Sequence, residues 1–302
     1  MTDDAGAGYG PGSWARSGAW DGTGLPPVAQ ARLAREGLVR SSLLSVGGAF
    51  GAEVVGLQPI GDVMGVIVEH VGWQGLGCPS YGFGGTYRGA GTVVSGAGGS
   101  WAGLGGYAQA LYRGYDTALD RLVQEATALS AHGVVGVTFD VRGLGQGNRE
   151  FIALGTAVRA DVGARPATPF TTLLGGADSA KLLLAGWVPV AAMVGLAIGI
   201  RHDDWATQRQ AMAWRANAEV SGYTDLVAST RAAARNELDA RGRAAGADGI
   251  VVDLLTTVVH SVEPSDNHID HVAESYLIGS SIAHVGGPHA VSARALAILP
   301  VS

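Results

Sequence analysis

Cysteine and charge are both scarce in this sequence, and each shortage excludes a class of protein. The single cysteine, Cys78, excludes an intrachain disulfide and a zinc site of several cysteines, and it fits a reducing compartment. Only 15% of the 302 residues are charged, and the formal net charge is -6. Broad binding to nucleic acid needs clustered cations, which this balance does not supply. We therefore expect a cytoplasmic protein that binds no nucleic acid.

Targeting and catalytic signatures are also missing. The N-terminus, MTDDAGAGYG, has acidic residues where a signal peptide has basic ones, and it reads as a flexible glycine-rich tail. The chain has no P-loop, no dinucleotide-binding glycine fingerprint after a strand, no HExxH zinc motif and no GxSxG nucleophile elbow. These absences do not exclude an enzyme, because most active sites carry no short motif.

What the sequence does contain is a repeat. The segment SAHGVVGVTFDV at 130–141 returns as GADGIVVDLLTT at 246–257, and REFIALGTAV at 149–158 returns as AESYLIGSSI at 273–282. Upstream, GGAFGAEVVG at 47–56 matches GGADSAKLLL at 175–184. Three blocks recur in the same order, which indicates a tandem duplication of a module of about 120 residues. The length of the chain also suggests two domains.

One apolar run, at residues 182–200, is long enough to be a membrane-spanning candidate by hydropathy. Pro189 breaks the run, and the matching stretch of the first module contains Asp62. Two copies of one fold are not expected to place the same element in different solvents. We therefore predict a short helix over 178–185 and a buried strand over 190–200, with membrane contact as the less favoured alternative.

Each module reads as a short helix, a strand, a long helix and a pair of strands. One helix covers only one face of a three-stranded sheet, so the other face needs a partner, most simply another module. We therefore predict an α+β fold of two tandem β-α-β-β modules, each with a mainly antiparallel three-stranded sheet and one long helix. In module 1 the elements are expected at 49–55, 61–70, 107–131, 134–141 and 151–158, and in module 2 at 177–185, 190–201, 205–245 with a break at Gly222, 250–259 and 276–285.

Turn signals and inserts complete this outline. Pro59 and Pro189 are expected in turns before the first strands, GLGQG at 143–147 predicts a tight turn, and module 2 is expected to have a longer loop there. Module 1 carries a glycine-rich, aromatic insert at 72–106, interpreted as an assembly loop, with a ligand-stacking loop as the alternative. The predicted boundaries are a tail at 1–27, module 1 at 28–162, module 2 at 163–286 and a tail at 287–302.

Two segments of each module carry a resemblance to a known family. ALSAHGVVGVTFDV and ALGTAV in module 1, and AAGADGIVVDLL and LIGSSI in module 2, resemble the YbjQ-like family, which carries a heavy-metal-binding label. Module 2 departs from the pattern at Asp253, Ser280 and Ser281. The resemblance implies small subunits of the dodecin-type fold that assemble into rings, typically of five, and it implies no catalytic residues. We expect a homo-oligomer in which five chains stack two rings, one of each module type.

The densest polar cluster is HSVEPSDNHIDHVAE at 260–274. Its imidazoles and carboxylates suit a divalent transition metal, and the candidate ligands are His260, His268, Asp270, His271 and Glu274. In extended strands His268 and Asp270 would point to one side, and His260 on the opposing strand could face them. A solvated hairpin tip is the alternative, because the matching loop of module 1 has no histidine.

The sequence as a whole predicts a non-enzymatic, ring-forming structural or binding protein. A metal-binding protein that uses the 260–274 hairpin is the first alternative, and an enzyme with its active site at a subunit interface is the second. Glu150 and Glu274 occupy the same position in the two modules, and we interpret both as structural residues that cap a strand or pair across a contact.

Overall fold

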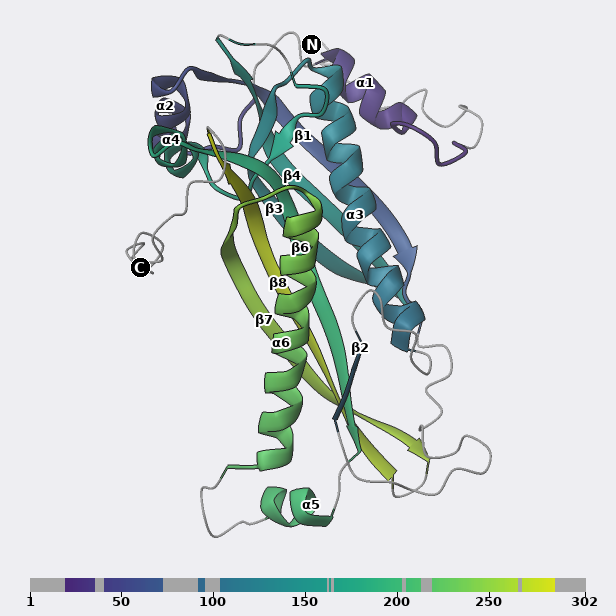
Figure 1. Cartoon of the computed structure of the whole chain (residues 1–302). Helices are drawn as coiled ribbons and strands as arrows, with labels where there is room; N and C mark the ends of the chain where they lie inside the picture. Colours follow the sequence, from purple (N-terminus) through teal and green to yellow (C-terminus); the bar gives the residue numbers. More distant parts are fainter. Residues whose placement is uncertain are drawn as a thin grey trace, which may run out of the picture.

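The two modules have the same topology in the computed structural model, which describes residues 20–35, 41–72, 92–95, 104–161, 163, 166–202, 205–212, 219–265 and 268–285 (Figure 1). The helices and strands of module 1 are α1 (Pro27–Arg35), α2 (Val46–Val54), β1 (Leu57–His70), β2 (Thr92–Ser95), α3 (Leu104–Ala128), β3 (Gly133–Gly145) and β4 (Asn148–Ala160). Those of module 2 are β5 (Phe170–Thr171), α4 (Gly176–Leu184), β6 (Trp187–His202), α5 (Trp205–Ala211), α6 (Ser221–Ala244), β7 (Gly249–Ser265) and β8 (His268–His284).

The last strand of each module lies in the middle of its sheet. The strand orders are β1-β4-β3-β5 and β2-β6-β8-β7, and the three main strands of each sheet pair antiparallel. Both first strands shift register at the same place, between Pro59 and Gly61 and between Pro189 and Ala191. The two prolines therefore lie inside strands, at a bulge that tolerates a residue without an N–H, and the predicted turns there are wrong.

Each module adds a short edge strand to the sheet of the other. Strand β5, at the start of module 2, pairs parallel with β3, and β2, from the module 1 insert, pairs antiparallel with β6. The sheets are therefore four-stranded rather than three-stranded. Most of the insert lies outside the described residues, so its role as an assembly loop stays a prediction. Its described strand nevertheless contacts the other module.

Glycines in the first strand of each module let the long helix approach the sheet closely. A Cβ atom at Gly65 would overlap the carbonyl oxygen of Ala118 in α3, and a Cβ atom at Gly195 would overlap that of Ala234 in α6. The same two glycines also face the backbone N–H groups of Leu122 and Leu238. The duplicated sequence thus repeats the same physical constraint in both modules.

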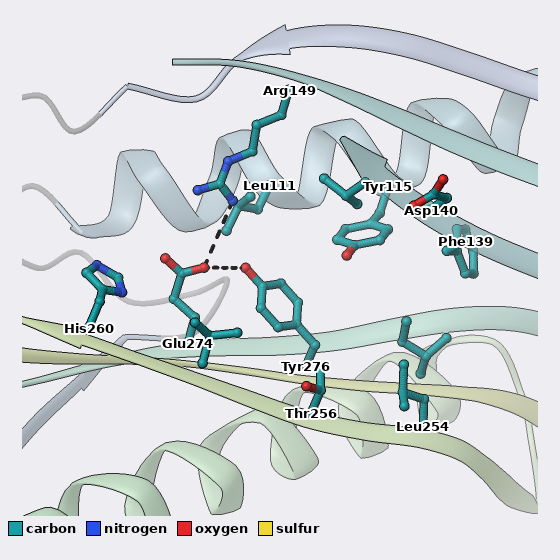
Figure 2. A pocket seen from close by; sticks show the side chains of 13 residues that line it. Leu111, Tyr115, Phe139, Asp140, Arg149, Leu254, Thr256, His260, Glu274 and Tyr276 are labelled. Carbon is teal, nitrogen blue, oxygen red and sulfur yellow. Dashed lines mark hydrogen bonds and ion pairs between the residues drawn. The ribbon is translucent and has the colours of Figure 1, made fainter. Parts of the chain in front are cut away.

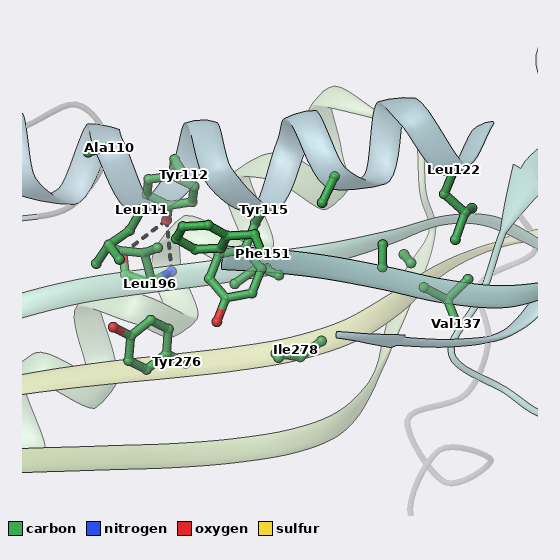
Figure 3. Close-up of a cluster of buried hydrophobic side chains, with 14 of the residues drawn as sticks. Ala110, Leu111, Tyr112, Tyr115, Leu122, Val137, Phe151, Leu196, Tyr276 and Ile278 are labelled. Atoms are coloured by element: carbon green, nitrogen blue, oxygen red, sulfur yellow. Dashed lines mark hydrogen bonds between the residues drawn. The ribbon is translucent and has the colours of Figure 1, made fainter. Parts of the chain in front are cut away.

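Helix α3 packs against strands of both sheets and contributes to one core shared by both modules (Figure 3). The hydroxyl of Tyr112 donates to the carbonyl of Leu196 at 2.9 Å and accepts from its N–H at 2.8 Å. Buried side chains of both sheets pack around the helix, among them Phe151 of β4 and Ile278 of β8. The prediction that another module covers the free face of a sheet is confirmed for the second sheet, since Val194, Leu196 and Ile198 of β6 belong to this core.

The segment before each short helix is anchored in the same way. The N–H of Leu43 donates to the hydroxyl of Thr156 at 3.0 Å, and the N–H of Leu173 donates to that of Ser280 at 2.9 Å. Serine therefore replaces threonine in module 2 without loss of the acceptor. These two hydrogen bonds align Leu43 with Leu173, and the helix N-caps Ser45 and Gly175 align with the same offset. The sequence repeat aligns Gly47 with Gly175, so the predicted alignment of 47–56 with 175–184 is wrong by two residues.

Several predicted elements differ from the observed ones at their ends. The loop predicted between 259 and 276 is strand on both sides, since β7 runs to Ser265 and β8 begins at His268. Gly222 lies in the first turn of α6, so the break in the helical stretch comes before it. The apolar run at 182–200 is the end of α4 followed by β6, and no helix in the described part of the chain is long and apolar enough to cross a membrane. The C-terminal tail at 287–302 and residues 1–19 lie outside the described residues.

Candidate functional site

A cleft of about 530 Å³ lies between the two modules (Figure 2). Its floor is the face of the second sheet that looks toward α3, and its walls come from α3, from the middle of β3 and from the start of β4. Alternation along paired strands places Leu254 and Thr256 of β7 beside Ile278 and Tyr276 of β8 on this floor. The residues that line it are Leu111, Tyr115, Phe139, Asp140, Val141, Arg149, Leu254, Thr256, Val258, His260, Glu274, Tyr276 and Ile278.

A buried carboxylate at one end of the cleft joins the modules. Glu274 is 6% exposed and accepts hydrogen bonds from the hydroxyls of Tyr107 at 2.7 Å and Tyr276 at 2.5 Å. Arg149 donates to the Tyr107 hydroxyl at 2.6 Å, and its guanidinium lies 4.0 Å from Glu274. Tyr107 and Arg149 belong to module 1, so the network crosses between modules. A buried charge needs such partners, because losing them would leave it uncompensated.

The predicted metal ligands are divided between the two faces of the β7–β8 hairpin. His260 lies opposite Val272, which puts it on the cleft face with Asp270 and Glu274. His271 lies on the other face, where its ring packs at a tilt of 45° against Tyr223 of α6 with centroids 4.4 Å apart. His268 pairs in backbone register with Ser265 near the hairpin end. No group of three or more histidine, cysteine or acidic side chains in the described residues is arranged to hold a metal, and the site stays a prediction.

Comparison with known proteins gives the family. A family model described as "Putative heavy-metal-binding" (YbjQ) matches residues 91–161. The encapsulin nanocompartment protein Rv1762c of Mycobacterium tuberculosis is 30% identical over 275 residues, which cover 89% of this chain and 95% of that protein. The chain belongs to the YbjQ family. A UPF0145 protein of Halorubrum lacusprofundi is 41% identical over 56 residues, 18% of this chain and 54% of that protein. No solved structure matches the chain.

Sequence reasoning missed most of the polar residues of this YbjQ-family cleft. It singled out Glu274 and His260 but not Arg149, Tyr107 or Tyr276, whose hydroxyl and guanidinium groups surround the carboxylate. Tyr107 comes from the edge of the glycine-rich insert and Arg149 from the neighbouring module. No spacing within one module signals a contact that forms only when two modules pack together.

We expect this YbjQ-family protein to lose stability as pH rises above about 10, because its core tyrosines cannot ionise easily. Burial raises the pKa of Tyr112 and Tyr115 to about 12, and burial raises the pKa of Tyr107 and Tyr276 further. Tyrosines of the unfolded chain ionise near 10.0, so the unfolded state releases protons that the folded state keeps. The stabilisation is complete below that pH and is lost as pH rises toward 12.

Urea midpoints measured from about pH 8 to about pH 11 would follow this loss directly. Absorbance of tyrosinate in the folded protein should show a late class of tyrosines that ionises only near the unfolding transition. A midpoint that stays constant to about pH 11 would show that these hydroxyls are not held protonated by the fold.

Proposed function

We propose that this chain is a non-enzymatic, self-assembling protein whose copies join head to tail into a ring, and that the ring works in an encapsulin nanocompartment. One observation carries the assembly: module 1 exposes the counterparts of the surfaces through which module 2 packs on it. In β6 the row Val194, Leu196 and Ile198 is buried against module 1. In β1 the matching row includes Met64 and Val68, which are 36% and 53% exposed. Helix α1 shares a hollow with Met64 and Val66 of this row, whereas Val68 does not line that hollow.

The short helices repeat the same relation. Helix α4 packs on α2 through Gly176, which lies against the backbone of Gly48. The N-caps place Val46 of α2 at the position that Gly176 holds in α4, and Val46 is 90% exposed. Phe50, one turn further on the same side of α2, is 68% exposed. These apolar side chains suit a contact with α4 of another copy.

The far end of the chain presents the complementary edge. In the fold, the start of module 2 pairs with the edge of β3 through backbone hydrogen bonds. The N–H of Thr172 donates to the carbonyl of Val134 at 3.0 Å, and the N–H of Val137 donates to the carbonyl of Thr172 at 2.9 Å. Strand β7, the counterpart of β3, is the edge of its sheet and pairs with β8 alone in the described part of the chain. Apolar residues along β7 are exposed, including Val252 and Val259. An apolar edge strand of this kind favours pairing with another chain.

The contact between modules joins different surfaces on its two sides, so it is heterologous. Repeating a heterologous contact extends an assembly head to tail, and the assembly closes into a ring when the rotation allows. This relation favours a single ring in which the two modules alternate, rather than the predicted stack of two rings with one module type in each. The prediction of five chains, made for two stacked rings, is carried over to this single ring, which would then contain ten modules. The Glu274 carboxylate accepts hydrogen bonds from two tyrosine hydroxyls, which supports a structural rather than a catalytic role for it.

The compartment part of the proposal rests on the relative named as an encapsulin nanocompartment protein, which aligns along nearly its whole length. This part of the proposal places the chain, which we expected in the cytoplasm, inside or on the surface of an encapsulin particle. When the chain is co-expressed with the encapsulin shell protein of its own host, we expect it in the purified high-mass particles. Protease treatment before and after opening the shell would distinguish inside from outside. Particles that form fully but contain none of this chain would contradict the proposal.

A further inference from the structure

The cleft between the modules has the size and the lining of a small-molecule site. Its volume of about 530 Å³ falls within the range of ligand pockets, which are mostly apolar with a few placed polar groups. Leu254, Val258 and Ile278 supply apolar surface from the second sheet, and Leu111 supplies it from α3. Because both modules contribute, the cleft exists only in the folded two-module chain.

Aromatic rings from both modules meet along one wall (Figure 2). The ring of Tyr115 lies 5.6 Å from that of Phe139 at an interplanar angle of 80°, and 6.3 Å from that of Tyr276 at 57°. Rings inclined at such angles offer both faces and edges to a bound aromatic group. A flat aromatic molecule therefore suits this wall better than a branched aliphatic one.

Two hydrogen-bond donors face the same space. In the described part of the chain no hydrogen bond involves the hydroxyl of Tyr115, and burial raises the pKa of this group to about 12, so it is a donor at neutral pH. Arg149 also lines the cleft and uses its guanidinium toward Tyr107 and Glu274. Since a guanidinium has five N–H groups, these two contacts leave Arg149 with donors for a ligand.

The acidic side chains at the cleft are already engaged. Glu274 accepts from the hydroxyls of Tyr107 and Tyr276, and Asp140 accepts from Arg142 at 2.7 Å. The carboxylate oxygens therefore have partners within the protein, and the groups left to bind a ligand are the remaining N–H donors of Arg149, with the imidazole of His260 nearby. Guanidinium groups favour carboxylate, sulfonate and phosphate oxygens.

From these observations we infer that the inter-module cleft binds a small flat aromatic anion, with its ring against Tyr115 and Tyr276 and its anionic group at Arg149. This site does not depend on ring assembly or on a compartment, because all of its residues belong to one chain.

The first test uses anilinonaphthalene sulfonate as the probe and two matched tryptophan variants of β7. Leu254 and Leu255 are 46% and 45% exposed, but Leu254 lines the cleft, whereas Leu255 pairs with Leu277 on the α6 side of the sheet. We expect saturable fluorescence enhancement at one site per chain, weakened at least about ten-fold by Leu254→Trp and less than about two-fold by Leu255→Trp. Equal loss in both variants, or no saturable binding, would overturn the inference.

The second test uses the unmodified protein, so it does not depend on the folding of a variant. N-phenylnaphthylamine has the same aromatic body as the first probe but no sulfonate. We expect the anionic probe to bind at least about ten-fold more tightly than the neutral one, and Arg149→Gln, which keeps an N–H donor for Tyr107, to remove the difference. Equal affinity of the two probes for the unmodified protein would show that the cleft recognises no anion.

Discussion

Replacing Gly195 with alanine is expected to lower the stability of the protein by about 3 kcal/mol or more, near the upper end for overpacking. The added methyl group would overlap the Ala234 carbonyl of α6, and the helix would have to move away from β6. Gly65→Ala should cost a similar amount, because the same contact with α3 exists in module 1. Thermal unfolding should show a fall in midpoint of roughly 6–12 °C for either variant.

Gly143 offers a matched control on β3. A Cβ atom added at this residue would meet no other atom within 4 Å, and its φ is not positive, so Gly143→Ala should change stability by less than about 1 kcal/mol. If Gly195→Ala and Gly143→Ala had equal effects, the close approach of helix to strand would not be a constraint of this fold. If Gly65→Ala and Gly195→Ala lowered the stability by very different amounts, the two modules would not share this constraint.

Introducing two aspartates on α2, in the double variant V46D/F50D, is expected to break the assembly into single chains. Both side chains are exposed within the chain, and Asp at the first residue of a helix is favourable, so the fold itself should tolerate the change. In the proposed ring, however, each interface would bury two new charges. We expect dissociation to become at least about 100-fold easier, which native mass measurement at micromolar concentration detects as chains of 30.6 kDa.

The double variant L144D/M212D adds the same charge at positions that are 55% and 79% exposed but belong to none of the repeated contact surfaces. It should leave the oligomer intact. Dissociation of both variants alike would mean that charge in general, rather than the α2 surface, controls assembly. An intact oligomer in V46D/F50D would remove α2 from the interface.

Much of the fold could be predicted because the constraints lie within one module. The valine-rich strand at β3, the GLGQG turn and the long helix predicted over 107–131 each depend on neighbours in sequence, and the repeat then transfers the topology to module 2. The long β7–β8 hairpin was missed beyond residue 259 because Glu263, Pro264 and Ser265 are polar or turn-forming residues. Strand pairing to His268 prevails over those local preferences.

The cleft was harder to predict than the fold because its chemistry is shared between modules. The histidine-rich segment attracted attention, yet His271 packs on Tyr223 outside the cleft. Arg149 and Tyr107, which neighbour Glu274 in space, are far from it in sequence. The strand additions by β2 and β5 escaped prediction for the same reason, since each short strand is stabilised by an edge that another module provides.

The native mass of the unmodified full-length chain tests the central claim most directly, because the exposed counterparts on module 1 have a purpose only if another copy covers them. The account predicts a single closed oligomer at micromolar concentration. Five chains, five times the chain mass of 30.6 kDa, would give about 153 kDa. A stable particle of one chain at 30.6 kDa, with Val46, Phe50 and Val68 left in water, would contradict it.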